Sequence, residues 1–169
     1  MLDVIKKRRS IRKYKLKLVE EEKLEAIFRA AMFSPSARHD RKWEFVVVTD
    51  REKIEKLGSM KLHSQHIKKA PLVIVICSPD WQYWVEDCSI VAENIYLEAT
   101  NQGLGTCFTQ VRDSVADDGS NPEEYVRKIL GIPKNIRVLC MMPIGYPAES
   151  LAEHSEKEFE NDKIHQNKW

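Results

Sequence analysis

This chain of 169 residues lacks any apolar segment long enough to cross a bilayer, because its longest apolar run covers only Leu72–Cys77. It also lacks a strong charge of one sign. The formal net charge is +1, so the chain as a whole is not suited to bind nucleic acid, and any anion site must come from a local cluster. No long apolar stretch precedes the basic run near the N-terminus, and we therefore expect a cytoplasmic location.

Cysteine is scarce and unpaired in sequence. The four cysteines form no C-x-x-C pair, so zinc binding and dithiol chemistry are disfavoured, and reduced, buried thiols are expected. His63 and His66 lie three residues apart but have no evident third ligand nearby, which favours two surface histidines over a metal site. No Ser/His/Asp or Cys/His set stands out for nucleophilic catalysis.

What remains is an ordinary globular composition, with 43% apolar and 31% charged residues, and a length that suits one domain. Hydrophobic periodicity and turn residues predict helices at residues 2–8, 19–33, 50–58, 81–102 and 122–130, and strands at residues 43–49, 72–77, 106–111 and 136–144. Residues 59–69 are polar and predict a loop or a short helix. This order indicates helices layered on a central sheet.

Three short segments contain residue types that suit ligand binding. Arg8-Arg9-Ser10-Ile11-Arg12 places three guanidinium groups within five residues, and such groups match phosphate oxygens. If the first helix continued through this segment, positions 8 and 12 would share a face. Small residues at Ser34-Pro35-Ser36-Ala37 would let a planar ligand approach the backbone. Gly103-Leu104-Gly105-Thr106 permits a tight reversal but is not a dinucleotide fingerprint, so a Rossmann fold is disfavoured.

Each segment taken alone also has an ordinary explanation: a solvated basic helix end, a helix-to-strand loop and a helix cap, respectively. The tail from Pro147 to Trp169 is polar, has 6 acidic residues and lacks a clear period. It ends in Trp169 with Ile164 nearby, so we expect it to dock on another surface, such as that of a second subunit.

Taken in order, the segments resemble the FMN-dependent nitroreductase family along nearly the whole chain. The matching blocks are Arg8–Arg12, Pro35–Ala37 with Trp43–Val48, Asp87, Ala92, Asn94, Leu97 and Ala99 with Gly103–Cys107, Ile144–Pro147, and the ending Ile164-His165 with Lys168-Trp169. Each block is loose, but this order is hard to obtain by accident.

The resemblance implies an α+β fold in which helices flank a central mixed or antiparallel sheet. It implies a single domain over residues 1–169 and an intertwined homodimer with two interfacial FMN sites, the tail from about residue 147 to residue 169 extending onto the partner. The residues that it assigns to FMN are Arg8, Arg9, Ser10 and Arg12 for the phosphate and pyrimidine side, Pro35, Ser36, Ala37 and His39 from the other subunit, Thr109, Gln110 and Val111 along the ring, and Lys157 as a basic residue of the tail. The cofactor supplies the redox chemistry, so no side chain is assigned as a catalytic acid or base.

The chain departs from the family pattern in the second block. His39, Arg41 and Lys42 stand where the family usually has Asn and then Gln-Pro before Trp. A histidine cannot offer the paired donor and acceptor of an amide. The two cations add positive charge, so an anionic substrate or reductant is one expectation.

The resulting functional hypothesis is an FMN-dependent oxidoreductase. It would take hydride from NAD(P)H and pass electrons to a small acceptor such as a nitroaromatic or quinone in a second step. Alternatives are another flavin reaction on the same fold, such as reductive dehalogenation or flavin fragmentation, and a flavin store or sensor without turnover. The sequence does not choose between NADH and NADPH.

Overall fold

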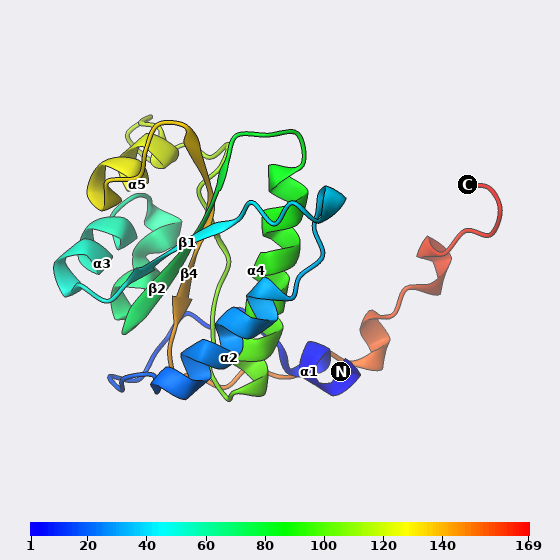
Figure 1. Cartoon of the computed structure of the whole chain (residues 1–169). Helices are drawn as coiled ribbons and strands as arrows, with labels where there is room; N and C mark the ends of the chain where they lie inside the picture. The colour runs from blue at the N-terminus through cyan, green and yellow to red at the C-terminus, as the bar shows by residue number, and fades with distance from the viewer.

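A four-stranded sheet forms the centre of the computed structural model, which describes all 169 residues (Figure 1). Its strands are β1 (Glu44–Val48), β2 (Leu72–Pro79), β3 (Thr109–Gln110) and β4 (Ile136–Ile144), and their order in space is β1-β2-β4-β3. Every pairing is antiparallel. Of the two sheet types expected, the antiparallel one is therefore confirmed, and a parallel Rossmann sheet is excluded.

Helices cover both faces of the sheet, as predicted. The helices of the structure are α1 (Leu2–Lys7), α2 (Glu21–Met32), α3 (Arg51–Gly58), α4 (Trp84–Asn101) and α5 (Pro122–Leu130), with short 3₁₀ segments η1 (Ala37–His39), η2 (Leu62–Lys69), η3 (Glu156–Glu158) and η4 (Asn161–Lys163). The long helix α4 packs with α2 on one face, and α3 and α5 lie on the other (Figure 1).

The central position of strand β2 in the sheet explains why its sequence is almost entirely apolar. Successive side chains of a strand point to opposite faces of the sheet. Ile74 and Ile76 enter the cluster formed with α2 and α4, whereas Val73 and Val75 enter the cluster formed with α3 and α5. Both faces of this central strand are therefore buried, which removes the polar alternation typical of a half-exposed strand.

The largest departure from the predicted elements concerns residues 106–111, where only Thr109 and Gln110 form a regular strand. Gly105 instead pairs with Gly145, and Thr106 bridges to Ser10 in a parallel sense. A Cβ at Gly105 would lie 2.6 Å from Cγ1 of Ile11, so glycine is required for this close crossing. The segment of residues 6–14, which we call the N-terminal arm, is thereby fixed beside the end of the sheet.

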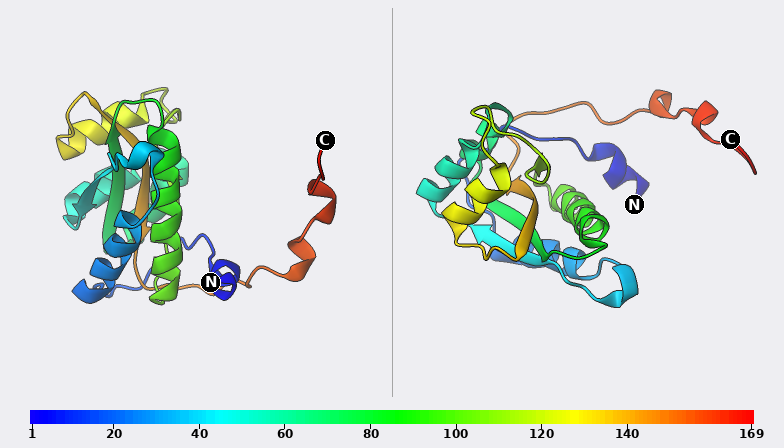
Figure 2. Two further views of the ribbon diagram at one scale, coloured as in Figure 1. Left: turned by 45° about the vertical axis from the view of Figure 1, so that its right-hand side comes forward. Right: turned by 90° about the horizontal axis from the view of Figure 1, so that it is seen from above.

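The segment near the N-terminus and the first part of the tail lie side by side. The N–H of Ala148 donates to the carbonyl of Lys13 at 2.8 Å, and the N–H of His154 donates to that of Lys6 at 2.9 Å. Figure 2 shows the tail extending away from the sheet and the helices. Its large apolar side chains stay exposed, and Trp169 is 98% exposed.

The four cysteines are buried and free, as expected. No helix of the structure combines the length and the apolar character that a membrane span requires.

Candidate functional site

The basic segment near the N-terminus is extended rather than helical. Helix α1 ends at Lys7, and Arg8 has ψ 119°, which takes the chain out of the helix. Ile11 then donates its N–H to the carbonyl of Thr106 at 2.9 Å. Arg8 and Arg12 therefore do not share a helix face, because the condition for that arrangement is not met.

Arg8 and Ser10 are both oriented by Tyr96 of α4. The Arg8 guanidinium lies 4.8 Å from the centroid of the Tyr96 ring, and the Tyr96 hydroxyl donates to Ser10 Oγ at 2.8 Å. Burial raises the pKa of Tyr96, so this phenol keeps its proton as a donor. One aromatic residue thus positions two of the predicted cofactor ligands.

The tail holds the same basic segment from its other side. Arg8 Nη2 lies 3.1 Å from His154 Nε2, and Arg9 donates to the carbonyl of Ala152. The carboxylate of Glu149 accepts the backbone N–H of Arg12 at 2.6 Å. We call this set of contacts between residues 6–14 and 147–158 the arm–tail ladder.

A pocket of about 280 Å³ opens where the N-terminal arm meets η2 and the residues that follow Gly103-Leu104-Gly105-Thr106, which we call the Gly-rich turn. It is lined by Arg12, Lys61, His63, His66, Cys107, Phe108, Thr109 and Gln110. The sequence prediction included Arg12, Thr109 and Gln110, and the structure brings these three together. It missed Lys61, His63 and His66, which add one ammonium group and two imidazole rings to the lining.

Lys61 and His66 both bond to β3, the strand that carries the predicted ring contacts. Lys61 Nζ donates to the Gln110 carbonyl at 2.7 Å, and His66 Nε2 lies 3.1 Å from Thr109 Oγ1. Burial lowers the pKa of Lys61. Burial, with Arg12 nearby as a smaller cause, lowers the pKa of His66, which favours the neutral imidazole near pH 7.

The interpretation of His63 and His66 as surface residues holds for His63 alone, because His66 is half-buried in this pocket. Segment η2 is a 3₁₀ helix, in which side chains three residues apart eclipse one another. Two histidines at that spacing therefore reach the same pocket. The three-residue spacing of the two histidines was the signal available in the sequence, although it was interpreted there as two surface residues.

The second predicted segment, Ser34–Ala37, is fixed by polar residues of α4. The buried Asp87 accepts the N–H of Ala37 at 2.9 Å, and Asn94 Nδ2 donates to Ser34 Oγ at 2.7 Å. The following turn adopts positive φ at three non-glycine residues, Arg38, His39 and Arg41. Such conformations need support from neighbouring contacts.

Arg41 and Lys42 have local partners that explain their presence. Arg41 Nη2 donates to the carbonyl of Met32 at the end of α2 at 2.7 Å. Lys42 pairs with Asp40 at 3.1 Å and lies 4.3 Å from the Trp81 ring centroid. These two cations therefore stabilise the loop, whereas Arg38 and His39 are exposed and have no side-chain bond.

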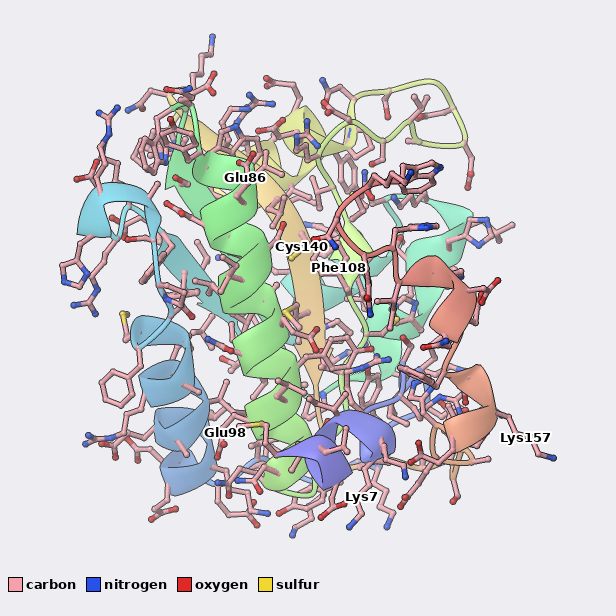
Figure 3. The ribbon with its side chains drawn as sticks, turned by 90° about the vertical axis from the view of Figure 1, so that its right-hand side faces the viewer. Lys7, Glu86, Glu98, Phe108, Cys140 and Lys157 are labelled. Carbon is pink, nitrogen blue, oxygen red and sulfur yellow. The ribbon has the colours of Figure 1, made fainter.

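Helix α4 separates the two predicted segments within one chain. Asn94 contacts the Ser34 side and Tyr96 contacts the Ser10 side, and residues two apart on a helix face opposite ways. Asp87 and Tyr96 are nine residues apart, which corresponds to about 14 Å along the axis. In Figure 3 the η1 turn and the tail flank α4 on opposite sides. Pro35, Ser36, Ala37 and His39 thus lie away from the cationic pocket of their own chain.

Five further predicted residues are also absent from the pocket lining: Arg8, Arg9 and Ser10 of the N-terminal arm, Val111 and Lys157. Val111 is fully buried in the core beside α3 and α5, and its N–H donates to the Leu139 carbonyl at 3.0 Å. Lys157 lies in η3 of the tail, and its side chain points away from the body (Figure 3).

The pocket has the donor set of an anion site. Its lining includes one arginine, one lysine and two histidines but no carboxylate. Guanidinium and ammonium groups bind phosphate oxygens and stabilise anionic rings. The residues present therefore fit a phosphorylated, redox-active ring such as FMN, and no cluster of three or more His, Cys, Asp or Glu side chains suitable for a metal ion occurs.

Comparisons with known proteins identify the family of this fold. The family model described as the nitroreductase family matches residues 5–79 and 59–146. A solved structure of an FMN-dependent nitroreductase from Clostridium difficile R20291 is similar, with a TM-score of 0.96 and 40% identity over 100% of both chains.

Two sequence relatives add functional context. One, from Methanothermobacter thermautotrophicus, is 38% identical over 100% of this chain and 87% of its own length, and its name pairs NADH dehydrogenase with NAD(P)H nitroreductase. An iodotyrosine deiodinase from Haliscomenobacter hydrossis is 26% identical over 84% of this chain and 77% of its own length. The antiparallel fold, the ordered motifs and these matches lead to one conclusion: the chain belongs to the nitroreductase family of oxidoreductases.

Proposed function

We propose that this protein is an FMN-dependent NAD(P)H oxidoreductase that reduces a small acceptor, such as a nitroaromatic or a quinone, in two steps. The observation that carries the proposal is the cationic pocket of about 280 Å³ between the N-terminal arm, η2 and β3. It joins predicted cofactor ligands from distant parts of the chain. The C. difficile structure, an FMN-dependent nitroreductase, supports FMN, and the M. thermautotrophicus relative, whose name includes NAD(P)H nitroreductase, supports NAD(P)H.

The chain's own groups have defined tasks in this reaction. When bound, FMN supplies a ring that accepts hydride from the nicotinamide and then gives up electrons. Arg8 and Arg9, oriented by Tyr96 and by the tail, offer guanidinium donors for the phosphate. Arg12 and Lys61 place positive charge where negative charge develops on reduction.

The second part of the proposal is that the site is completed by a second copy of the chain. The Pro35–His39 segment lies across α4 from the pocket, so one chain does not bring all predicted ligands to one place. The tail beyond the arm–tail ladder exposes Phe159, Ile164 and Trp169. Large exposed apolar side chains on an extended segment suit docking on a partner. Residues from about 147 to 169, Lys157 among them, are therefore assigned to the partner's surface.

Flavin binding is tested by purifying the protein, recording its visible spectrum and titrating it with FMN. We expect a yellow protein with about one FMN per chain. A colourless protein that does not take up added FMN would contradict the proposal. Sedimentation velocity of the same sample should give a dimer, and a flavin-loaded monomer would contradict the shared site.

Turnover is tested by anaerobic mixing of the flavin-loaded protein with NADH and with NADPH. Rapid bleaching by one or both, reversed by a nitroaromatic or a quinone, is the expected result. Bound flavin that neither nucleotide bleaches would favour a store or sensor instead. Product analysis with a halogenated phenol and with reduced flavin separates dehalogenation or flavin fragmentation from acceptor reduction, and a relative with a deiodinase name makes this control worthwhile.

A further inference from the structure

The sequence analysis assigned no function to His66. It lies on η2, half-buried, with Nε2 3.1 Å from the Thr109 hydroxyl in the cationic pocket. Thr109 is one of the residues assigned to the flavin ring. A half-buried histidine that contacts a ring ligand can change its charge when the charge of the bound ring changes.

The surroundings of His66 determine which charge state it holds. The N-terminal arm contributes Arg12, η2 contributes Lys61 and His63, and the Gly-rich turn contributes the Cys107 thiol, whose pKa is raised by burial. Two carboxylates lie nearby but outside the lining: Glu149 bonds the backbone of Arg12 and Lys13, and Asp117 bonds the N–H of Leu62 and faces Lys61. Cations thus dominate the lining, and they disfavour a further positive charge until an anion arrives.

Hydride uptake supplies that anion. A hydride brings two electrons and one proton, so the nicotinamide becomes NAD(P)⁺ and the flavin gains one negative charge. We propose that His66 takes up one proton from solvent at this step, so that the reduced, anionic flavin is paired with a new imidazolium. This inference rests on the proposed function. The charges balance, because the anion formed on the flavin is matched by the proton gained on His66, and re-oxidation returns that proton.

His66 and His63 offer a matched comparison. Both line the pocket, but His63 is exposed and has no side-chain bond to β3, whereas His66 bonds Thr109. The structure assigns the proton to His66 alone. His66→Gln keeps a hydrogen-bonding group but cannot titrate. His66→Lys supplies a permanent cation, and His63→Gln is the control.

The first measurement is the midpoint potential of the bound flavin as a function of pH. A two-electron couple moves by about 30 mV per pH unit for each proton taken up. The wild-type protein should approach about 60 mV per pH unit from pH 6 to 7.5, because two protons accompany two electrons, and H63Q should do the same. H66Q and H66K should fall to about 30 mV per pH unit, with H66K at the higher potential throughout.

The second measurement follows the His66 ring directly in the wild-type holoprotein. Nitrogen-15 spectra of labelled histidine, assigned with H66Q and H63Q, should give a neutral His66 ring at pH 7 with oxidised flavin and an imidazolium after reduction. A ring with the same charge in both states overturns the inference, even if H66Q fails to fold.

The outcomes separate the two proposals. A wild-type protein that neither binds FMN nor is bleached by NAD(P)H overturns the proposed function, and this inference with it. A protein that is bleached normally but has equal pH slopes in wild type, H66Q and H63Q overturns only the role of His66.

Discussion

The two predicted cofactor segments are held in place in different ways. Arg8–Arg12 is held on one side by Tyr96 of α4 and on the other by the arm–tail ladder, in which residues more than 130 positions apart meet through exposed or half-exposed groups. Ser34–Ala37 depends on two side chains of the same helix alone, Asp87 and Asn94. The difference indicates that the loop is part of the folded core, whereas the tail side of the arm can respond to a ligand or a partner.

The largest expected effect is loss of the Asp87 anchor. Asp87→Ala leaves the half-buried Ala37 N–H without its buried acceptor, so the free energy of unfolding should fall by about 2 kcal/mol. Urea denaturation monitored by circular dichroism measures this. Glu86→Ala is the matched control, since Glu86 is an exposed acid in the same first turn of α4, and a surface change there should stay within about 0.5 kcal/mol. An equal fall in the free energy of unfolding of both variants would mean that the loss comes from the negative charge at the start of α4 and not from the hydrogen bond between Asp87 and Ala37.

The next effect concerns the ladder and should appear in ligand binding rather than in folding. Glu149 accepts the N–H groups of Arg12 and Lys13, so Glu149→Ala frees the arm, and we expect the FMN dissociation constant to rise about tenfold. Fluorescence quenching of added FMN measures it. Glu149→Gln, which keeps an acceptor, should recover most of the affinity. Glu153→Ala, in the same tail but without a bond, should bind as the wild type does. A large loss of stability in Glu149→Ala would contradict the separation of the two regions.

Acid should open the ladder before it unfolds the core. Bonds from Lys6 lower the pKa of Glu156, and bonds from His154 lower the pKa of Glu158. A carboxylate with a depressed pKa in the folded state stabilises it above the unfolded value, about 4.3, and that stabilisation is lost as pH falls through the folded pKa.

Hydrogen exchange between pH 5 and 3 measures this opening. The amides of Ala148 and His154 should lose protection, corrected for intrinsic rates, ahead of β2. Lys6→Ala should reproduce part of the loss at pH 7, and Lys7→Ala, which removes an exposed lysine with no partner, should not. Simultaneous loss of protection in the tail and in β2 would show that the two regions unfold together.

The smallest effect concerns backbone strain in the loop. Arg38 has φ 56° and an exposed side chain without a bond, so Arg38→Gly removes the steric cost of the left-handed conformation. Part of that gain is offset by the greater freedom of glycine in the unfolded chain, which leaves a gain of about 0.5 kcal/mol. Asp40→Gly, at a residue with φ −73°, should destabilise the protein instead. Thermal unfolding of the two variants measures whether each gains or loses stability. A loss of stability in Arg38→Gly would indicate that the loop is not strained.

The sequence predicted the elements of this fold well where apolar periodicity is strong. Strand β2 and helices α2 and α5 lie within one or two residues of the predicted bounds. The predicted strand over residues 106–111 shortened to two residues, because Thr106 pairs with Ser10 and Gly105 with Gly145. Pairings between such distant residues leave no local periodicity, so no reading of a short window can find them.

The candidate site was also predicted only in part. Arg12, Thr109 and Gln110 were predicted through the resemblance and do meet in one pocket, but Lys61 and His66 were missed. A polar stretch without apolar period looks like a loop, and its direction is set by packing of Ile67 and by the bonds of Lys61 and His66 to β3. The positive charge of Arg41 and Lys42 is used within the fold instead, because Arg41 bonds the Met32 carbonyl of α2 and Lys42 pairs with Asp40 and contacts the Trp81 ring.

The sequence by itself determined the elements, the absence of a long apolar span and the ordered blocks that identify the family, because local propensity and residue type are written along the chain. Only the tertiary structure decided that the chain ends pair with each other, that α4 stands between the two cofactor segments and that His66 faces the pocket. Those facts depend on contacts between residues far apart in sequence, and such contacts exist only after the sheet has brought the segments together.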